Sequence, residues 1–303
     1  MTLEQYFDNK RVNIKNLALR SSEVGSSSIF DPETDITPDD WNHILKEVEE
    51  QRKEKDWIDF LPLAADLKTL SPKKYEQLFP TGKSWQNFED NIASYFRESG
   101  FHSSEKQSCR LLGYLKTISP RAERDLHFYI HHIDWHGMTY ELIDHFNYHD
   151  WQRFWNKTSF NSGILTLKLI FKDDNFYSKA YEKFEKNYIL KGFEKAQVSG
   201  LIDHFNGEWG GESDLEALAN MKLFSPERFE KKKGGKNLNW GKMKKMLSEY
   251  RKEGWWTTFL KNAARMNVLA AEKIEMTEDG LEVWRAPQRK FSGKSSLPEK
   301  RKF

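Results

Sequence analysis

Large aromatic residues recur along this chain in pairs whose members lie 16 positions apart, and apolar residues at helical intervals follow them. After Trp41, aliphatic residues at positions 44, 45 and 48 fall on one helical face, and a charged stretch separates them from the next face, which begins at Trp57. The pattern predicts two amphipathic helices joined by a turn, the second beginning at the second aromatic residue. The five pairs are Trp41/Trp57, Trp85/Phe101, Trp135/Trp151, Phe193/Trp209 and Trp240/Trp256.

Capping signals mark where these helices begin and end. Trp41 follows Thr37-Pro38-Asp39-Asp40, in which threonine can cap a helix, proline suits its first position and aspartates favour the positive end of its dipole. Ser-Pro pairs at 71–72, 119–120 and 225–226 follow the second apolar faces. Because proline cannot continue a helix, each of these pairs is expected to close a unit.

The five predicted units begin near residues 41, 85, 135, 193 and 240, at intervals of 44, 50, 58 and 47 residues. The segments 142–147 and 201–206 share the string Leu-Ile-Asp-His-Phe-Asn. Over residues 37–275 the intervals and paired helices resemble HEAT and armadillo arrays, whose units run about 40–47 residues. We therefore expect an all-α fold, a HEAT/armadillo-like α-solenoid of about five helical hairpins. This resemblance is one of architecture and implies no functional residues.

The predicted repeat domain spans residues 37–284, between two segments of different composition. Residues 1–36 are expected to be an N-terminal leader and linker, because serine and glycine crowd positions 21–28. Residues 285–303 are expected to form a flexible basic tail, because they offer few apolar groups to bury. Inside the domain, apolar residues of 274–284 flank Glu278-Asp279-Gly280, a turn signal that predicts a small strand pair or a terminal cap.

Composition narrows the class of protein. Hydrophobic residues make up only 38% of the 303 residues, but aromatic residues make up 14%, and large rings can build a core from few positions. Cys109 is the only cysteine, which excludes an intramolecular disulfide and a thiolate metal cluster. The N-terminus lacks the pattern of a secretory signal, and no apolar run approaches the roughly 20 residues of a membrane span. We expect a soluble, cytoplasmic protein that requires no cofactor and no membrane.

The net charge is only +2, but positive charge is concentrated in the last quarter of the chain. Residues 227–252 contain ten Lys/Arg and three Asp/Glu, and residues 285–303 contain seven and one. Such stretches are either solvated basic faces or phosphate-binding surfaces. RNA or DNA binding through the 228–252 stretch and the tail is therefore an alternative function. The candidate binding residues are Lys231, Lys232, Lys233, Lys242, Lys244, Lys245, Arg289, Lys290, Lys300, Arg301 and Lys302.

Histidines supply a third hypothesis, a hydrolase. Six of the nine histidines lie between residues 127 and 149, and pairs four apart share a helical face, as metal ligands on a helix do. Arg121 and His127 are spaced as in the Arg-His motif of HEPN-type ribonucleases, which they resemble. A local polar cluster explains the same residues, and we expect no bound metal. The candidate metal ligands are His127, His131, His132 and His136.

The fixed spacing predicts that the ten paired aromatic residues belong to the core. Trp155, Trp255 and Trp284 fall outside the spacing and are expected at the surface. Repeat arrays present extended surfaces to partners. The sequence as a whole therefore predicts a non-enzymatic binding or adaptor protein with a protein partner, ahead of a nucleic-acid-binding protein and of a metal-dependent or HEPN-like hydrolase.

Overall fold

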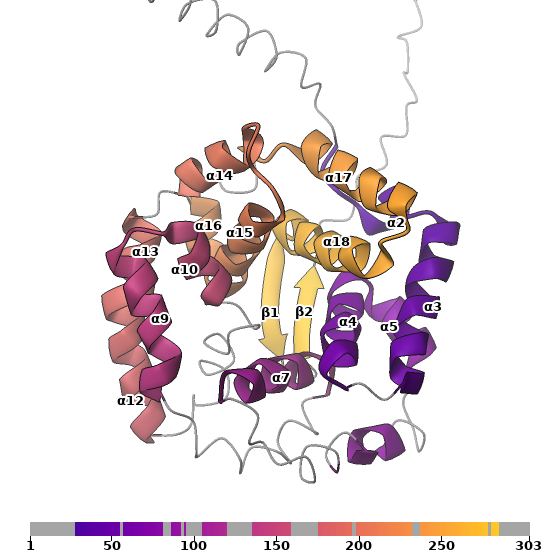
Figure 1. Ribbon diagram of the computed structural model, residues 1–303, viewed down its shortest axis with the longest axis horizontal. Helices are drawn as coiled ribbons and strands as arrows, with labels where there is room; N and C mark the ends of the chain where they lie inside the picture. The colour runs from indigo at the N-terminus through magenta and orange to yellow at the C-terminus, as the bar shows by residue number, and fades with distance from the viewer. Residues whose placement is uncertain are drawn as a thin grey trace, which may run out of the picture.

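The computed structural model describes residues 28–54, 57–80, 86–91, 94, 105–119, 135–158, 175–195, 198–231, 237–277 and 280–284. Within these ranges the protein is mostly helical, as predicted, and contains one two-stranded hairpin (Figure 1). The elements are α2 (Pro32–Asp35), α3 (Pro38–Glu54), α4 (Trp57–Leu70), α5 (Pro72–Leu78), α7 (Glu105–Ile118), α9 (Trp135–Asn147), α10 (Trp151–Lys157), α12 (Asn175–Phe184), the π-helical turn η4 (Glu185–Ile189), α13 (Leu190–Lys195), α14 (Val198–Asn206), α15 (Glu212–Phe224), α16 (Pro226–Lys231), α17 (Trp240–Glu253), α18 (Trp256–Ala270), β1 (Lys273–Thr277) and β2 (Gly280–Trp284).

The second helix of a predicted hairpin begins at its aromatic residue in three units. Trp57, Trp151 and Trp256 are the first residues of α4, α10 and α18. The prediction is wrong for Trp209, which lies in the turn between α14 and α15 and is 88% exposed. That turn is longer because α15 begins only at Glu212, after two glycines that do not favour helix.

Capping side chains fix helix starts at predicted positions. The Asp40 backbone N–H donates to Thr37 Oγ1 over 3.2 Å, and the Thr37 N–H donates to Asp40 Oδ2 over 2.8 Å. This reciprocal pair satisfies two backbone donors at the start of α3. Ser71 caps α5 in the same region, with Pro72 at the first helical position, as predicted from the Ser-Pro pair.

The second helices pack side by side, and the first helices lie outside them. Helix α4 contacts α7 on one side and α18 on the other, α18 contacts α15, and α15 contacts α10. Figure 1 shows α3, α17, α14 and α9 on the outer side of this row. The α4–α18 contact brings the first predicted hairpin against the last.

The strand pair predicted near the end of the domain is confirmed. Strands β1 and β2 are antiparallel, with Ile274 opposite Val283 and Met276 opposite Leu281. Strand β2 contacts α7 and α4, and Leu281 is buried. The hairpin therefore follows α18 and packs back onto helices of the first two units.

Residues 28–36, which the sequence assigned to a linker, include a part that packs on the helical body. Phe30 and Ile36 are buried. Lys244 of α17 forms an ion pair with Asp35 at 2.9 Å, and Arg251 donates to the Asp35 carbonyl over 3.2 Å. The segment is thus held against α17, so the packed structure begins before residue 37.

A second contact of Arg251 joins α17 to the start of α3. Its Nε and Nη2 atoms donate to the two carboxylate oxygens of Asp40, each over 2.7 Å. Burial alone would raise the pKa of Asp40, but hydrogen bonds from Arg251 and Thr37 lower it below its ordinary value. Asp40 therefore stays ionised at neutral pH and keeps the two-pronged pair intact.

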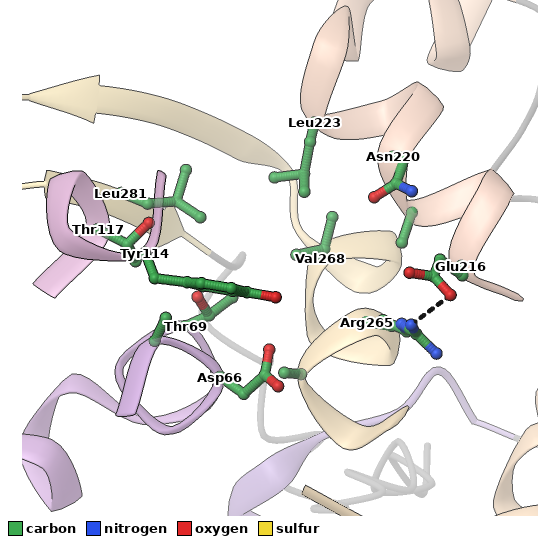
Figure 2. A pocket seen from close by; sticks show the side chains of 13 residues that line it. Asp66, Thr69, Tyr114, Thr117, Glu216, Asn220, Leu223, Arg265, Val268 and Leu281 are labelled. Carbon is green, nitrogen blue, oxygen red and sulfur yellow. Dashed lines mark ion pairs between the residues drawn. The ribbon is translucent and has the colours of Figure 1, made fainter. Parts of the chain in front are cut away.

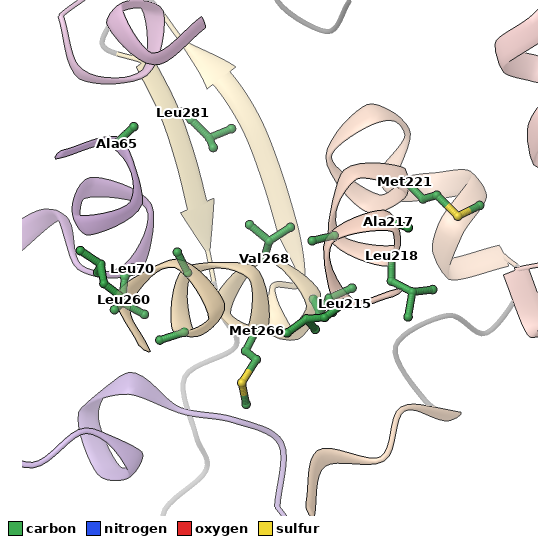
Figure 3. Close-up of a cluster of buried hydrophobic side chains, with 14 of the residues drawn as sticks. Ala65, Leu70, Leu215, Ala217, Leu218, Met221, Leu260, Met266, Val268 and Leu281 are labelled. Carbon is green, nitrogen blue, oxygen red and sulfur yellow. The ribbon is translucent and has the colours of Figure 1, made fainter. Parts of the chain in front are cut away.

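The core follows the row of second helices. Figure 3 shows buried side chains from α4, α15, α18 and β2 in one cluster, among them Ala65, Leu218, Met266 and Leu281. Of the ten paired aromatic residues, Trp41, Phe193 and Trp240 are buried, whereas Trp151 and Trp256 are half-buried. The structure does not describe the side chains of four others, which are Trp57, Trp85, Phe101 and Trp135.

Trp155 is completely buried, contrary to the predicted surface position. Its ring contacts Phe154, Phe193 of α13 and Phe224 of α15, with centroids 5.2, 4.5 and 6.3 Å away. Helix α10 is covered on more than one side, so residues outside the fixed spacing also enter the core. Trp255 is 56% exposed, as predicted, and the side chain of Trp284 is not among those described.

One lysine, Lys222 of α15, is buried. Its Nζ donates to Glu230 Oε1 over 2.6 Å and to the carbonyls of Leu269 and Ala271 over 2.8 and 2.7 Å. Burial lowers the pKa of Lys222, while the Glu230 carboxylate opposes that shift. The ammonium thereby satisfies carbonyls at the C-terminal end of α18 and fixes that end to α15 and α16.

Candidate binding surface at the helix turns

Three exposed aromatic side chains lie in three turns, each between the first and second helix of a hairpin. Tyr148 follows α9, Trp209 follows α14 and Trp255 follows α17, and they are 82%, 88% and 56% exposed. Aromatic residues are enriched at protein interfaces, where they supply large rigid contact areas. We call these three side chains, with the turns that carry them, the turn-edge surface.

Polar contacts connect neighbouring turns. Gln152, in the first turn of α10, donates its Nε2 to Asp214 Oδ1 over 2.7 Å. Tyr250 of α17 donates its hydroxyl to Glu212 Oε1 over 2.5 Å, and its ring stacks on Trp255 with centroids 6.2 Å apart. The start of α15 is therefore tied to α10 on one side and to the end of α17 on the other.

The Tyr250 hydroxyl stays protonated and donates its hydrogen bond to Glu212 throughout the physiological pH range. Burial raises the pKa of Tyr250 above its ordinary value, and the hydrogen bond to Glu212 raises it further. The phenol keeps its proton across the physiological range, so the contact with Glu212 does not depend on pH there.

Asp214 organises the start of α15. Its carboxylate is 1% exposed and accepts hydrogen bonds from the Gly211 N–H at 3.1 Å and from Gln152. Nδ1 of His204 lies 3.1 Å from both carboxylate oxygens, and the His204 side chain is 55% exposed. Asp214 thus orients a surface imidazole beside the turn that carries Trp209.

The Trp209 turn is fixed from both ends. A Cβ added at Gly210 would lie 2.1 Å from the Phe205 carbonyl oxygen, so a larger residue does not fit there. Lys242 of α17 donates its Nζ to the carbonyls of Phe205 and Gly207 over 2.5 and 2.6 Å. These bonds satisfy carbonyls at the end of α14, as a capping lysine does.

Two of the candidate nucleic-acid-binding lysines are therefore engaged inside the protein. Lys242 caps α14, and burial lowers its pKa although the Asp214 carboxylate opposes the shift. Lys244 pairs with Asp35 and donates to Ser28 Oγ over 3.1 Å. Lys231 and Lys245 are exposed.

The remaining candidates lie beyond the part of the chain that the structure describes. They are the basic residues Lys232, Lys233, Arg289, Lys290, Lys300, Arg301 and Lys302, and the proposed hydrolase residues Arg121, His127, His131 and His132. His136 belongs to α9, but its side chain is likewise not described. Among the described residues, no three His, Cys, Asp or Glu side chains gather as metal ligands would.

Sequence reasoning missed Asp214, Glu212 and Tyr250, which join the turns. The sequence contained one sign of this site, the string shared by 142–147 and 201–206. The string forms the C-terminal ends of α9 and α14, and its second copy includes the histidine that contacts Asp214. The partners of that histidine lie in the following helix, so the string alone does not identify them.

Comparison of the chain with protein-family models, curated proteins and solved structures finds no match. None of the helices in the described ranges combines the length and apolar composition needed to cross a membrane.

Proposed function

We propose that this chain is a non-enzymatic binding protein whose helical hairpins form a HEAT-like repeat array and whose turn-edge surface docks a protein partner. The observation that carries the proposal is Trp209, which is 88% exposed in a turn fixed by Gly210 and by the Lys242 hydrogen bonds. Because the backbone of this turn is fixed before binding, no loop has to be ordered when a partner covers the ring.

Helix contacts support the repeat-array part of the proposal. Second helices of successive units touch in the pairs α4–α7, α10–α15 and α15–α18, and the α4–α18 contact also packs the first unit on the last. Units that each pack mainly on their neighbours are the defining property of such arrays. Tyr148, Trp209 and Trp255 come from three consecutive predicted units.

The engagement of two lysines favours a protein over a nucleic acid. Lys242 and Lys244 would have to leave the carbonyls of Phe205 and Gly207 and the carboxylate of Asp35 to reach phosphates. A surface built for phosphates leaves its cations available to replace counterions. The turn-edge surface instead offers three exposed aromatic rings.

A comparative pull-down tests the proposal. The full-length protein and a Trp209→Ala/Trp255→Ala double variant would be used to capture partners from native lysate, with nuclease-treated and untreated arms. We expect one or more proteins whose recovery resists nuclease and falls at least tenfold in the double variant, since aromatic anchors contribute about 2 kcal/mol or more when buried by a partner.

A Tyr140→Ala variant is the matched control, because Tyr140 is also 67% exposed but lies within α9 and not in a turn. Its recovery of the same proteins should equal that of the unaltered chain. Recovery that disappears with nuclease would support the RNA or DNA alternative. Recovery that the double variant retains in full would contradict a role for the turn-edge surface.

A further inference from the structure

A cavity with polar and apolar walls lies among the second helices and β2. It has a volume of about 70 Å³ and is walled by α4, α7, α15, α18 and β2. One water needs about 10–15 Å³ by this measure, so the cavity has room for about five water molecules or a similarly small ligand. The cavity is open to solvent on one side, since Asp66, Glu216 and Leu223 of its wall are half-buried.

The cavity has a polar end and an apolar end. Figure 2 shows the carboxylates of Asp66 and Glu216 and the guanidinium of Arg265 near one end, and Leu223 and Leu281 at the other. The Tyr114 ring reaches across the space from α7. A ligand that fills the cavity therefore needs a polar head and a short apolar body.

The guanidinium of Arg265 has a charged and a polar neighbour, although its buried Nη2 forms no hydrogen bond with the described residues. Its Nη2 lies 2.7 Å from Glu216 Oε2, and its Nη1 donates to Asn262 Oδ1 over 3.2 Å. Asp66 has no comparable partner: its carboxylate makes no hydrogen bond or ion pair with any residue that the structure describes. The positive charges of Arg265 and of Lys261 on α18 act on the Asp66 carboxylate, but neither forms an ion pair with it among the described residues. The carboxylate is therefore available to a ligand that donates hydrogen bonds.

Neutral polar and aromatic groups line the same cavity as Asp66. Asn220 donates its Nδ2 to the Trp155 carbonyl over 3.1 Å, so its Oδ1 remains the acceptor of that side chain at the cavity wall. Thr69 adds a hydroxyl, and the Tyr114 ring offers a face that attracts cations. One carboxylate with neutral oxygens suits an ammonium ion, whose three N–H groups each need an acceptor.

We propose that this cavity binds a small primary alkylammonium ion, with its ammonium group donating to Asp66 and its alkyl chain against Leu223 and Leu281. The proposal does not rest on protein docking at the turn-edge surface.

A proton competes with the ammonium ion for Asp66. Burial raises the pKa of Asp66 to about 7, with Glu216 adding to the shift and Arg265 and Lys261 of α18 opposing it. The ligand binds the ionised carboxylate, so affinity rises with pH up to about 7 and then levels. A primary amine keeps its own charge across this window, because its pKa is close to that of lysine, about 10.4.

Calorimetric titration of the full-length protein with n-propylammonium chloride tests the proposal. We expect saturable binding with a dissociation constant of about 1 mM, which lies within the affinity ceiling for a four-atom ligand. Binding at about pH 8 should be roughly tenfold tighter than at about pH 6. Sodium chloride of equal ionic strength and n-propanol, which has the same length and no charge, should give no saturable heat.

Two variants make the result specific to the cavity. Asp66→Asn should abolish binding while remaining folded, because asparagine matches the size and charge of the protonated carboxyl. Asp59→Asn removes an exposed carboxylate from the same helix and should bind as the unaltered chain does. Absence of saturable binding, equal binding by Asp66→Asn, an affinity that does not change with pH, or equal binding of n-propanol would each overturn the proposal.

Discussion

Replacing Trp155 with alanine is expected to lower the free energy of unfolding by about 3–5 kcal/mol. Trp155 is fully buried, and its ring contacts Phe154, Phe193 and Phe224 from three helices. Removing the indole leaves a cavity at the junction of α10, α13 and α15 that surrounding rings cannot refill without leaving their rotamers. The loss includes both the transfer of the ring to water and the cavity that remains.

Urea denaturation followed by tryptophan fluorescence and circular dichroism measures this loss. Trp209→Ala is the control, because it removes the same side chain from a position that is 88% exposed. That variant should stay within about 0.5 kcal/mol of the unaltered protein. Equal destabilisation by the two substitutions would contradict the assignment of Trp155 to the core and of Trp209 to the surface.

Replacing Lys222 with methionine is expected to cost about 3 kcal/mol, even though methionine is apolar and of similar length. The substitution removes the donor that serves Glu230 and the carbonyls of Leu269 and Ala271. Two of these acceptors are main-chain groups at the end of α18 that have no route to water without local opening. The Glu230 carboxylate is 41% exposed and can be rehydrated, which keeps the cost below that of a fully buried pair.

The same denaturation experiment on Lys231→Met provides the comparison, since Lys231 is exposed at the end of α16. We expect its effect to be within about 0.5 kcal/mol. If Lys222→Met were as mild as Lys231→Met, the three hydrogen bonds would not hold α18 in solution.

Local signals in the sequence predicted local structure well. The Thr37 and Ser71 caps and the helix starts at Trp151 and Trp256 all depend on residues within one or two turns of the chain. Such features follow from backbone donors and from apolar periodicity, which the sequence displays directly.

Features that depend on distant partners were missed. Trp155 is buried by Phe193 and Phe224, and Trp209 is excluded from the core because α15 starts late; neither follows from a spacing of 16 residues. From the sequence alone Lys244 is a solvent-exposed cation, whereas in the structure it forms an ion pair with Asp35.

The cavity also could not be predicted from the sequence. Its polar end combines Asp66 of α4 with Glu216 of α15 and Arg265 of α18. Each of these residues is an ordinary helical charge when only its own helix is considered. They lie close together because the first hairpin packs on the last. The spacing of apolar residues along the chain does not predict that contact.

Site-specific photocrosslinking at position 209 tests the central claim most directly. A photoreactive phenylalanine derivative would replace Trp209 in one variant of the full-length protein and Tyr140 in another, and both would be irradiated in native lysate with and without nuclease. We predict a discrete protein adduct at position 209 that survives nuclease and is missing at position 140. Adducts of equal yield at both positions, adducts removed by nuclease, or no adduct at position 209 would contradict a protein-docking surface at the helix turns.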